Sequence, residues 1–567
     1  MQVNELFKQS NTILLDGGMG TMLQAAGLKL GARPEELNIT DPALIEGIHA
    51  QYAAAGSRIV NANTFGASAH KLAGSAYTLE QIITAGIENC KRACAPYGAL
   101  TALDVGPLGE LLEPSGTLAF EDAVAEYARI VKAGEAAGAD LIFFETYTDL
   151  YELKAALLAA KENTRLPILA SMSFEAGGRT FTGCTVESFA ATARGLGADA
   201  VGINCSLGPK EIFPMAKRLA EAVPGNFPVF VKPNAGLPRA DGSGYDITPQ
   251  LFALQMKPYR ELHLFAAGGC CGTTPEFIKL LNGTFAGCTP GRPAHRMSSV
   301  LCTPVDAVTV DGITVVGERI NPTGKKRFQQ ALREGDMNYV LEQAVSQAEA
   351  GAQVLDVNVG APGVDEPVLM EQVVKALQSV TSLPLQLDSS NVEALARGLR
   401  VYNGKPIVNS ADAGSRISYI DLAAANDAIC IALCSADGIA KDNEERMMHC
   451  HHMLERGLSL GMEATDLWFD PLFLVVKGMQ DKQMDVLNAI KLFSDEGLKS
   501  TGGLSNNSNG APKNVRPIMD SALVAMAMMQ GLTSAIVNPN DLRLMETIKS
   551  CDIFKNHVLY SDSYLEL

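Results

Sequence analysis

The sequence predicts an α/β protein built from two tandem (β/α)8 TIM barrels. The chain has 567 residues, which is too many for a single hydrophobic core. Short apolar runs alternate with alanine-rich helical stretches, as in repeated βα units around parallel strands. Nearly every run of the first half ends in a polar residue, which is where barrel enzymes place their active sites. Two barrels of roughly 250 residues each would account for the whole length.

We expect eight strands in each half. In the first half they lie near Ile13–Asp16, Ile59–Thr64, Thr101–Val105, Leu141–Glu145, Ile168–Phe174, Ala200–Cys205, Val229–Asn234 and Leu264–Gly269. In the second half they lie near Thr314–Glu318, Val354–Asn358, Leu385–Asp388, Ile407–Asn409, Ile429–Cys434, Leu467–Asp470, Gly503–Asn506 and Ile536–Asn538. A proline- and glycine-rich stretch around Thr289–Pro293 and Pro304 interrupts the pattern. We therefore predict a first barrel over residues 1–295, a linker over 296–310 and a second barrel over 311–567.

Composition excludes several classes of protein. A net charge of -17 argues against a nucleic-acid partner, because phosphate binding needs a basic surface. Residues 1–10 lack the apolar centre of a signal peptide, and no stretch approaches the ~20 apolar residues of a membrane span. The twelve cysteines are not regularly spaced, so they do not resemble a secreted disulfide framework. We expect a cytoplasmic protein with reduced cysteines and no membrane partner.

The adjacent cysteines Cys270 and Cys271, flanked by glycines, indicate a site for a soft metal ion. A vicinal pair cannot complete a tetrahedral zinc site, and the best third ligand is Cys205, which also follows a short apolar run. Three thiolates leave one position open, as in a catalytic zinc site. Each of the other polar strand ends, such as Asp16 or Glu145, could equally be a helix cap or a turn former.

Five segments of the first half stand at or near predicted strand ends: Asp16-Gly17-Gly18-Met19-Gly20-Thr21, Asn63-Thr64-Phe65-Gly66, Gly202-Ile203-Asn204-Cys205, Pro233-Asn234-Ala235-Gly236 and Gly268-Gly269-Cys270-Cys271-Gly272. Together they resemble the zinc-dependent homocysteine S-methyltransferase barrel. The resemblance implies Zn²⁺ on Cys205, Cys270 and Cys271, and homocysteine as substrate. It also implies homocysteine contacts from Asp16, Gly17, Glu145, Asn204 and Asn234. Asp16 and Glu145 suit the substrate ammonium, the Gly17-Gly18 turn suits its carboxylate, and Asn234 can approach the metal before substrate binds.

The second half carries a different set of segments: Gly317-Glu318-Arg319-Ile320-Asn321-Pro322, Leu355-Asp356-Val357-Asn358, Leu387-Asp388, Asn409-Ser410, Phe469-Asp470-Pro471 and Gly503-Leu504-Ser505-Asn506. These resemble the pterin-binding barrel. The resemblance implies that 5-methyltetrahydrofolate contacts Glu318, Asn321, Asp388, Asn409, Asp470, Asn506 and Arg516. Carboxylates suit the donor-rich edge of a pterin, and Asn506 is implied to hydrogen-bond the methyl-bearing ring nitrogen. Ala411-Asp412-Ala413-Gly414 departs from the glycine and glutamate expected after Ser410.

Found in this order, the two barrels resemble the substrate-binding half of the cobalamin-dependent methionine synthase family. The expected activity is 5-methyltetrahydrofolate:homocysteine methyl transfer, which gives methionine and tetrahydrofolate, with Asn506, Cys205, Cys270 and Cys271 as catalytic residues. The sequence has no Asp-x-His-x-x-Gly corrinoid-binding signature. We therefore expect cobalamin to be bound by a further region or by a separate corrinoid protein. Two alternatives remain: a homocysteine methyltransferase with another methyl donor or corrinoid protein, and a non-catalytic zinc scaffold that docks a carrier protein.

Overall fold

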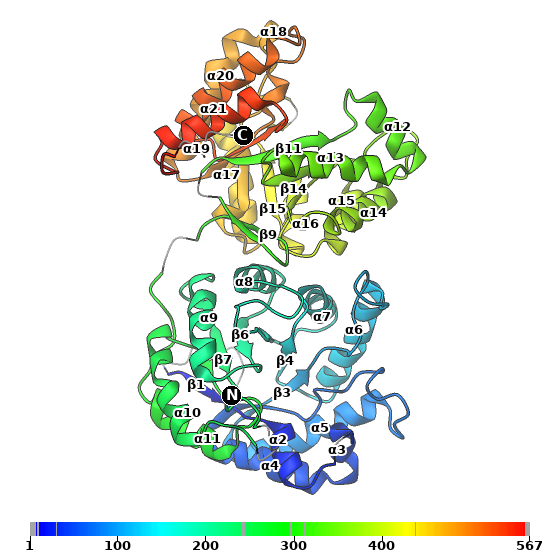
Figure 1. Cartoon of the computed structure of the whole chain (residues 1–567), viewed down its shortest axis with the longest axis vertical. Helices are drawn as coiled ribbons and strands as arrows, with labels where there is room; N and C mark the ends of the chain where they lie inside the picture. The colour runs from blue at the N-terminus through cyan, green and yellow to red at the C-terminus, as the bar shows by residue number, and fades with distance from the viewer. Residues whose placement is uncertain are drawn as a thin grey trace. The chain divides into compact units, whose positions relative to one another are not determined.

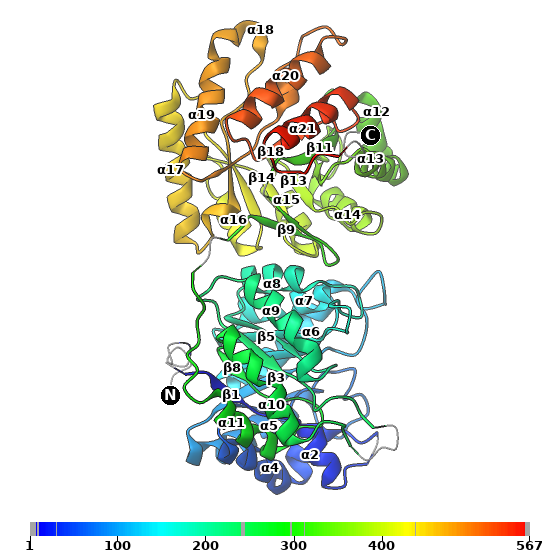
Figure 2. The same ribbon diagram turned by 60° about the vertical axis from the view of Figure 1, so that its left-hand side comes forward.

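The computed structural model describes residues 7, 11–29, 31–239, 244–294, 297–310, 312–436 and 438–561. The chain divides into two compact units, Met1–Arg296 and Met297–Leu567, and each unit contains an eight-stranded parallel sheet surrounded by helices (Figures 1 and 2). The prediction of two (β/α)8 barrels is therefore confirmed. The predicted domain limits at residues 1, 295, 296, 311 and 567 lie outside the described residues.

The first unit is a closed barrel in which every strand pairs with the next and β8 pairs with β1. Its strands are β1 (Ile13–Leu15), β2 (Ser57–Asn61), β3 (Leu100–Val105), β4 (Leu141–Tyr147), β5 (Ile168–Met172), β6 (Ala200–Asn204), β7 (Val229–Lys232) and β8 (Ala266–Ala267). The helices are α2 (Met19–Ala25), α3 (Leu37–Thr40), α4 (Pro42–Ala55), α5 (Leu79–Cys94), α6 (Phe120–Ala136), α7 (Leu150–Asn163), α8 (Val186–Gly195), α9 (Pro209–Glu221), α10 (Pro249–Gln255) and α11 (Pro275–Phe285).

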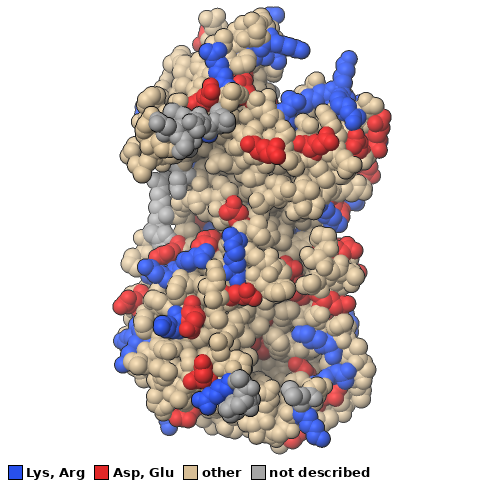
Figure 3. Space-filling model, in the orientation of Figure 1, with Lys and Arg blue, Asp and Glu red and all other residues tan. Residues whose placement is uncertain are grey.

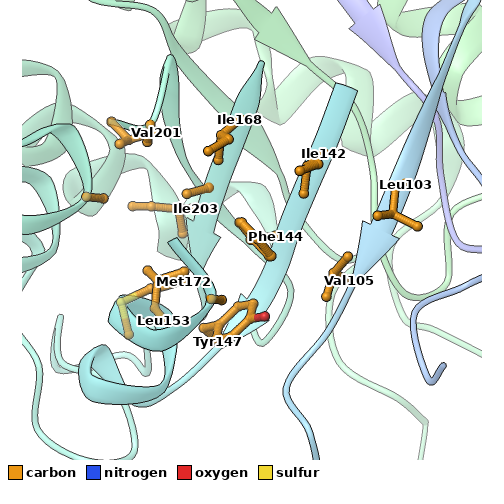
Figure 4. Close-up of a cluster of buried hydrophobic side chains, with 14 of the residues drawn as sticks. Leu103, Val105, Ile142, Phe144, Tyr147, Leu153, Ile168, Met172, Val201 and Ile203 are labelled. Carbon is orange, nitrogen blue, oxygen red and sulfur yellow. The ribbon is translucent and has the colours of Figure 1, made fainter. Parts of the chain in front are cut away.

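Alternation along the strands of the first barrel produces two apolar layers. Successive strand residues point to opposite faces of a sheet. Leu103, Ile142 and Phe144 therefore point outward, where they meet residues of the surrounding helices such as Leu153 of α7 (Figure 4). Residues of the opposite phase, among them Phe143, form a separate cluster that fills the barrel interior.

The inward positions that follow this interior cluster toward the C-terminal strand ends are polar. They are Asn61, Asp104, Glu145, Ser171, Asn204 and Lys232, and all are buried. The same alternation that fills the barrel with apolar side chains thus places a polar layer above them. A buried polar layer is costly unless its groups are paired, so its contacts are described with the candidate site below.

The second unit contains a nearly closed barrel with the sheet order β17-β16-β15-β14-β13-β12-β11-β18. Two backbone hydrogen bonds, from Thr533 to Ser500 (3.3 Å) and from Ile536 to Gly502 (3.0 Å), connect its edges. The strands are β11 (Thr314–Ile320), β12 (Val354–Val357), β13 (Leu385–Asp388), β14 (Ile407–Asp412), β15 (Ile429–Leu433), β16 (Leu467–Asp470), β17 (Lys499–Ser500) and β18 (Ser534–Val537). The helices are α12 (Lys326–Glu334), α13 (Met337–Glu349), α14 (Glu366–Gln378), α15 (Val392–Val401), α16 (Tyr419–Ala425), α17 (Asn443–Ser459), α18 (Val476–Met479), α19 (Gln483–Asp495), α20 (Arg516–Met529) and α21 (Leu542–Phe554).

One strand prediction is wrong. The seventh strand of the second barrel is Lys499–Ser500, whereas the predicted segment Gly503–Asn506 forms a turn of 3-10 helix over Leu504–Asn506. Thr501 and two glycines follow this strand, and a Cβ on Gly502 would lie only 2.4 Å from the Phe473 ring. The backbone at Gly502 thus packs closely against the Phe473 ring, and a 3-10 turn follows in place of the expected strand.

The segment that the sequence analysis assigns to a linker forms a hairpin. Val300–Cys302 (β9) pairs antiparallel with Ala307–Thr309 (β10). Leu301 and Val310 pack with residues from the N-terminal ends of the second barrel's strands, and Trp468 donates its indole N–H to Ser299 Oγ at 2.9 Å. The hairpin therefore covers the N-terminal end of the second barrel.

Two further properties concern the surface. Among the described residues, no helix is long and apolar enough to cross a membrane. Acidic and basic side chains are interspersed on the face of the molecule drawn in Figure 3.

His49 should make the stability of the first barrel depend on pH. It is fully buried in α4, and in the described part of the chain neither ring nitrogen has a hydrogen-bond partner. Burial lowers the pKa of His49 to about 3. The unfolded chain binds a proton near pH 6.5 and the folded chain does not, so stability is lost as the pH falls from 6.5 toward 3. At pH 5 the expected loss is about 2 kcal/mol.

Urea unfolding of the first barrel at pH 7 and pH 5 measures this loss. The His49→Leu variant should lose this part of the pH dependence, because it has no proton to bind. The exposed residue His70 provides the control, since His70→Leu should keep the dependence of the wild type. Equal pH dependence in the wild type and in His49→Leu would contradict the assignment.

Candidate active sites at the C-terminal strand ends

Three cysteine sulfurs converge at the C-terminal end of the first barrel. Cys205 follows β6, and Cys270 and Cys271 follow β8, so the two segments flank β7. The three Sγ atoms lie within 4.8 Å of one another, and Cys205 Sγ is 3.8 Å from Cys271 Sγ. The end of β7 fixes both segments, because Lys232 O accepts from Cys205 N (3.1 Å) and Pro233 O accepts from Cys270 N (2.9 Å). These are ligand atoms that could hold one metal ion.

The three thiols do not ionise equally. Hydrogen bonds from Cys205 and Cys270 lower the pKa of Cys271 to about 3. The pKa of Cys205 is raised, because its proton is shared with the neighbouring sulfurs. The triad therefore already stabilises a thiolate at Cys271, and a thiolate is the form that binds metal.

Asparagines and a tyrosine surround the triad. Asn204 Nδ2 is 3.8 Å from Cys270 Sγ, and its Oδ1 accepts from Ser171 Oγ and from Thr146 N, both at 2.9 Å. Asn234 Oδ1 accepts from the backbone N–H of Cys271 at 3.1 Å. Tyr245, which the sequence analysis does not single out, hydrogen-bonds Cys271, and burial with this thiol raises the pKa of Tyr245 to about 12. The positions of the cysteines are thus set by side chains from several strands.

The polar layer beneath the triad contains a buried ion-pair network centred on Lys232. Its Nζ lies 3.0 Å from Asp16 Oδ1 and 3.1 Å from Glu145 Oε2, and all three side chains are at most 10% exposed. The other Asp16 oxygen, Oδ2, accepts from Asn61 N at 2.8 Å. Burial by itself would lower the pKa of Lys232, but the two facing carboxylates raise it well above its usual value. Lys232 therefore carries its charge inside the barrel.

Burial has the opposite effect on the carboxyl partners. It raises the pKa of Glu145 to about 7, even though the Lys232 charge lowers it. Asp104 lies in the same polar layer, and burial and the Glu145 charge raise its pKa as well. Sequence reasoning missed Lys232. The available signal was a single lysine at an inward position of the apolar strand Val229–Lys232, where a cation requires anionic partners.

The Gly17-Gly18 turn packs directly on the loop that carries Cys270 and Cys271. Gly18 N donates to Thr273 Oγ1 at 3.2 Å, and Thr273 Oγ1 donates to Cys270 O at 2.6 Å. A Cβ on Gly17 would lie 2.7 Å from Thr273 Oγ1, and one on Gly18 would lie 2.8 Å from Cys270 O. Glycine is therefore required at both positions by the close approach of two loops.

The second barrel has a cavity of about 670 Å³ at its C-terminal strand ends. All seven residues that the sequence analysis assigns to folate contacts line it: Glu318, Asn321, Asp388, Asn409, Asp470, Asn506 and Arg516. They come from β11 and the residue that follows it, from β13, β14 and β16, from the turn after β17 and from the start of α20. Barrel geometry thus gathers residues that are almost 200 positions apart in the sequence.

The acidic groups of this cavity are held by amides. Asp388 Oδ2 accepts from Asn358 Nδ2 at 3.0 Å and from Asn321 Nδ2 at 3.4 Å. Asp356, which the sequence analysis does not assign to the site, accepts from Gln386 and Asn409. Burial raises the pKa of Asp388 to about 6 and that of Asp470 to about 7. Such carboxyl groups gain from a ligand that offers several N–H donors.

Asn506 lines the cavity and is exposed, whereas Asp356, Asp388 and Asp470 are buried or half-buried. It ends the 3-10 turn Leu504–Asn506, next to Ser505, whose hydroxyl donates to Glu318 Oε2 at 2.6 Å. Arg516 begins α20 and donates its Nε to Ala511 O at 3.1 Å. The side-chain amide of Asn506 is thus offered to the cavity by a turn that is tied to β11.

Replacement of Lys232 by methionine should strongly destabilise the first barrel. The change leaves Asp16 and Glu145 buried without their counter-charge. Loss of one partner of a buried ion pair typically costs about 3–5 kcal/mol. We expect a loss of this size in urea unfolding of the first barrel at pH 7.

The control is Lys217→Ala, which removes a lysine from an exposed pair with Glu221. Such a pair should contribute at most about 1 kcal/mol. A loss for Lys232→Met no larger than for this control would show that the buried network does not stabilise the barrel.

Comparisons with known proteins agree with the two-part organisation. The homocysteine S-methyltransferase family profile matches residues 13–285, and the pterin binding enzyme profile matches residues 317–538. The chain is 29% identical over 575 residues to methionine synthase of Mycobacterium leprae, covering 93% of this chain and 47% of that protein. It is also 29% identical over 576 residues to methionine synthase of Mycobacterium tuberculosis. This match covers 94% of this chain and 48% of the mycobacterial protein.

Among solved structures, the homocysteine methyltransferase MmuM from Escherichia coli in its metallated form has 24% sequence identity and a TM-score of 0.43. The structural match covers 50% of this chain and 99% of the MmuM chain. The chain spans about half the length of the methionine synthases that it matches. With each barrel matched by its own family, residues 13–285 belong to the homocysteine S-methyltransferase family and residues 317–538 to the family of pterin-binding enzymes.

Proposed function

We propose that this chain is a methyltransferase that moves a methyl group from 5-methyltetrahydrofolate, bound in the second barrel, to homocysteine, bound in the first. The products are methionine and tetrahydrofolate. Cobalamin, held by a further region of the protein or by a separate corrinoid protein, would supply the methyl carrier that this transfer needs. The observation that carries this proposal is the pairing, on one chain, of a cysteine triad with an acid-lined cavity, each in a barrel of the matching family.

The donor set of the triad fits Zn²⁺. Three sulfurs within 4.8 Å of one another can occupy three corners of a tetrahedron and leave the fourth for a substrate. Cys205, Cys270 and Cys271 would hold the ion. Bound there, Zn²⁺ would favour the thiolate form of a coordinated thiol, which is otherwise a minor species at neutral pH.

The polar layer suits the amino-acid end of homocysteine. Both Asp16 oxygens already accept hydrogen bonds, from Lys232 and from Asn61. Among the described residues, only one Glu145 oxygen has a partner, so the other can accept from the substrate ammonium. Lys232 offsets part of the carboxylate charge and holds Glu145 in place. The Gly17 backbone, Asn204 and Asn234 complete the proposed contacts around the substrate and the triad.

The second cavity suits a pterin. Asp388 and Asp470 can accept from the donor edge of the ring, with Glu318, Asn321, Asn409 and Arg516 as further contacts. The ring nitrogen must gain a proton as it loses its methyl group, because a neutral tertiary amine is a poor methyl donor. Asn506 is proposed to hydrogen-bond this nitrogen, and the contact strengthens as positive charge develops there.

The Cys270→Ser Cys271→Ser variant tests the role of the triad. It removes two of three soft ligands, so we expect loss of bound zinc and of methyl transfer from free methylcobalamin to homocysteine. Tetrahydrofolate binding should persist, because that site lies in the other unit. Metal analysis and the homocysteine half-reaction are the measurements.

Cys551→Ser, which changes a cysteine outside the triad, should retain both the metal and the activity. Stoichiometric zinc in the double variant would rule out the triad as the metal site. Zinc that is lost without an effect on the homocysteine reaction would instead favour a structural role.

The Asn506→Ala variant tests the second barrel. Loss of one preorganised contact to developing charge typically costs roughly 100- to 1,000-fold in rate. Transfer from 5-methyltetrahydrofolate to free cob(I)alamin should fall by this factor, with a much smaller change in folate affinity. Transfer from methylcobalamin to homocysteine should stay near wild type.

Asp388→Ala is the matched comparison. It removes a contact to the distant pterin edge, where little charge develops, so it should act mostly on affinity. If Asn506→Ala slowed both half-reactions equally, or neither, the role assigned to Asn506 would be wrong.

A further inference from the structure

Asn506 has no contact of its own that fixes its amide. It is exposed at the cavity, and its side chain has no hydrogen-bond partner in the part of the chain that the structure describes. The orientation of such a group depends on the backbone that carries it, here the 3-10 turn Leu504–Asn506. A side chain that acts on one ring nitrogen must be held to within about 0.5 Å. The neighbours of Asn506 must therefore supply the constraint.

Asn507, the next residue, is turned into the protein interior. Its neighbours Asn506 and Ser508 line the cavity, whereas Asn507 does not and is only 4% exposed. Its Nδ2 donates to Leu474 O at 3.0 Å and also donates to Gln483 Oε1. A buried amide is unfavourable without such partners. These two hydrogen bonds therefore hold the Asn507 side chain in one position.

The contacts of Asn507 join two loops. Its backbone N–H donates to Leu504 O at 3.0 Å, which closes the turn that carries Asn506. Its backbone O accepts from Val476 N, also at 3.0 Å. Val476 and Leu474 belong to the segment that follows β16, the strand that ends in Asp470. Asn507 thus connects the turn after β17 to the segment after β16 through both its backbone and its side chain.

The segment after β16 is itself held at two places. Gln483 at the start of α19 donates its Nε2 to Leu474 O at 3.2 Å and to Met479 O at 3.0 Å. Nearer to β16, the Nε of Arg446 donates to Pro471 O at 3.2 Å, and Arg446 is only 2% exposed. The turn that carries Asn506 is therefore anchored to a segment that has fixed positions of its own.

Two further contacts hold the turn, but they lie at the cavity. Ser505 donates to Glu318 Oε2 at 2.6 Å, and Ser508 donates to Asp520 Oδ2 at 3.2 Å. Both carboxylates line the cavity, so a bound ligand can compete for them. The partners of Asn507 do not line it. The anchor through Asn507 is therefore independent of what occupies the cavity.

We propose that Asn507 is a positioning residue for methyl transfer in the second barrel, because it holds the turn that presents Asn506. The inference rests on the proposed function. Asn507 would not touch the folate, and it would act only through the position of the Asn506 amide. A displacement of about 1 Å at a reacting group can cost about 100-fold in rate. Loss of Asn507 should therefore slow the reaction that uses Asn506 without a comparable loss of folate affinity.

The Asn507→Leu variant removes both side-chain hydrogen bonds and keeps a buried side chain of similar size. Transfer from 5-methyltetrahydrofolate to free cob(I)alamin, measured with the full chain, should fall about 10- to 100-fold in kcat. The Kd for tetrahydrofolate should change less than about threefold. Gln483→Met removes one partner from outside both the turn and the cavity. It should lower kcat at least about threefold, and it decides the question if Asn507→Leu does not fold.

A double variant separates positioning from a merely structural role. If Asn507 acts through Asn506, the contact that it positions is already absent in Asn506→Ala. Asn507→Leu should then change kcat less than about twofold in that background, although it has its full effect in the wild type. The same loss of kcat in both backgrounds would show that Asn507 does not act through Asn506, and would overturn the proposal.

Gln378→Leu is the matched control. Gln378 is a half-buried amide at the end of α14 that also joins two segments, since its Nε2 donates to Val401 O at 3.1 Å and its Oε1 accepts from Asn403 N at 2.7 Å. It does not line the cavity. Urea unfolding should show a loss of stability for Gln378→Leu, whereas its kcat should stay at the wild-type value.

Two failures can be told apart. A wild-type kcat in Asn507→Leu, or in Gln483→Met, together with the expected loss in Asn506→Ala would overturn the positioning role and leave the proposed function intact. An Asn506→Ala variant with wild-type kcat would instead overturn the role assigned to Asn506, and the inference with it.

Discussion

Both sites depend on the geometry of a parallel sheet that is rolled into a barrel. All strands of each barrel run in the same direction, so their carboxyl ends meet on one face. In the first barrel this brings residues after β6 and β8 within a few ångströms, although they are 65 positions apart in the sequence, as with Cys205 and Cys270. In the second barrel it surrounds one cavity with side chains from Glu318 to Arg516.

The interior charge of the first barrel follows from the same geometry. Alternation along the strands sends Asn61, Asp104, Glu145 and Lys232 inward at one level. Uncompensated carboxylates at that depth would be very unfavourable, and Lys232 provides the compensating charge for Asp16 and Glu145. The network supports the loops that carry the cysteines, because Asp16 O also accepts from Gly269 N. The buried ion-pair network and the loop that carries Cys270 and Cys271 are thus parts of one connected structure.

The second barrel brings acidic and basic side chains to a single cavity. Asp356 and Asp388 accept from side-chain amides, whereas Arg319, Lys325, Lys513 and Arg516 line the same cavity. The β9–β10 hairpin covers the N-terminal end of this barrel, and the cavity lies at the opposite end. The two barrels thus present different chemical groups at their C-terminal ends although they share a fold.

The sequence by itself determined the fold class, since alternating apolar runs and helical stretches predict repeated βα units without any tertiary information. It also determined which residue types stand at the strand ends, including the vicinal cysteines and Asp388. It failed at Gly503–Asn506, where contact with Phe473 and two glycines favour a turn. It also gave no hint that residues 299–310 would pack on the second barrel, because a short hairpin next to prolines resembles a linker.

Only the tertiary structure decided which side chains contact one another. Lys232 looks like an ordinary strand residue until closure of the barrel brings Asp16 and Glu145, 216 and 87 positions away, within hydrogen-bonding distance. The pairing of Tyr245 with Cys271 and the grouping of Arg319 with Lys513 have the same origin. Local patterns fix secondary structure because they act over a few residues. Charge compensation and cavity lining depend on distances in space, which are set only when the barrel closes.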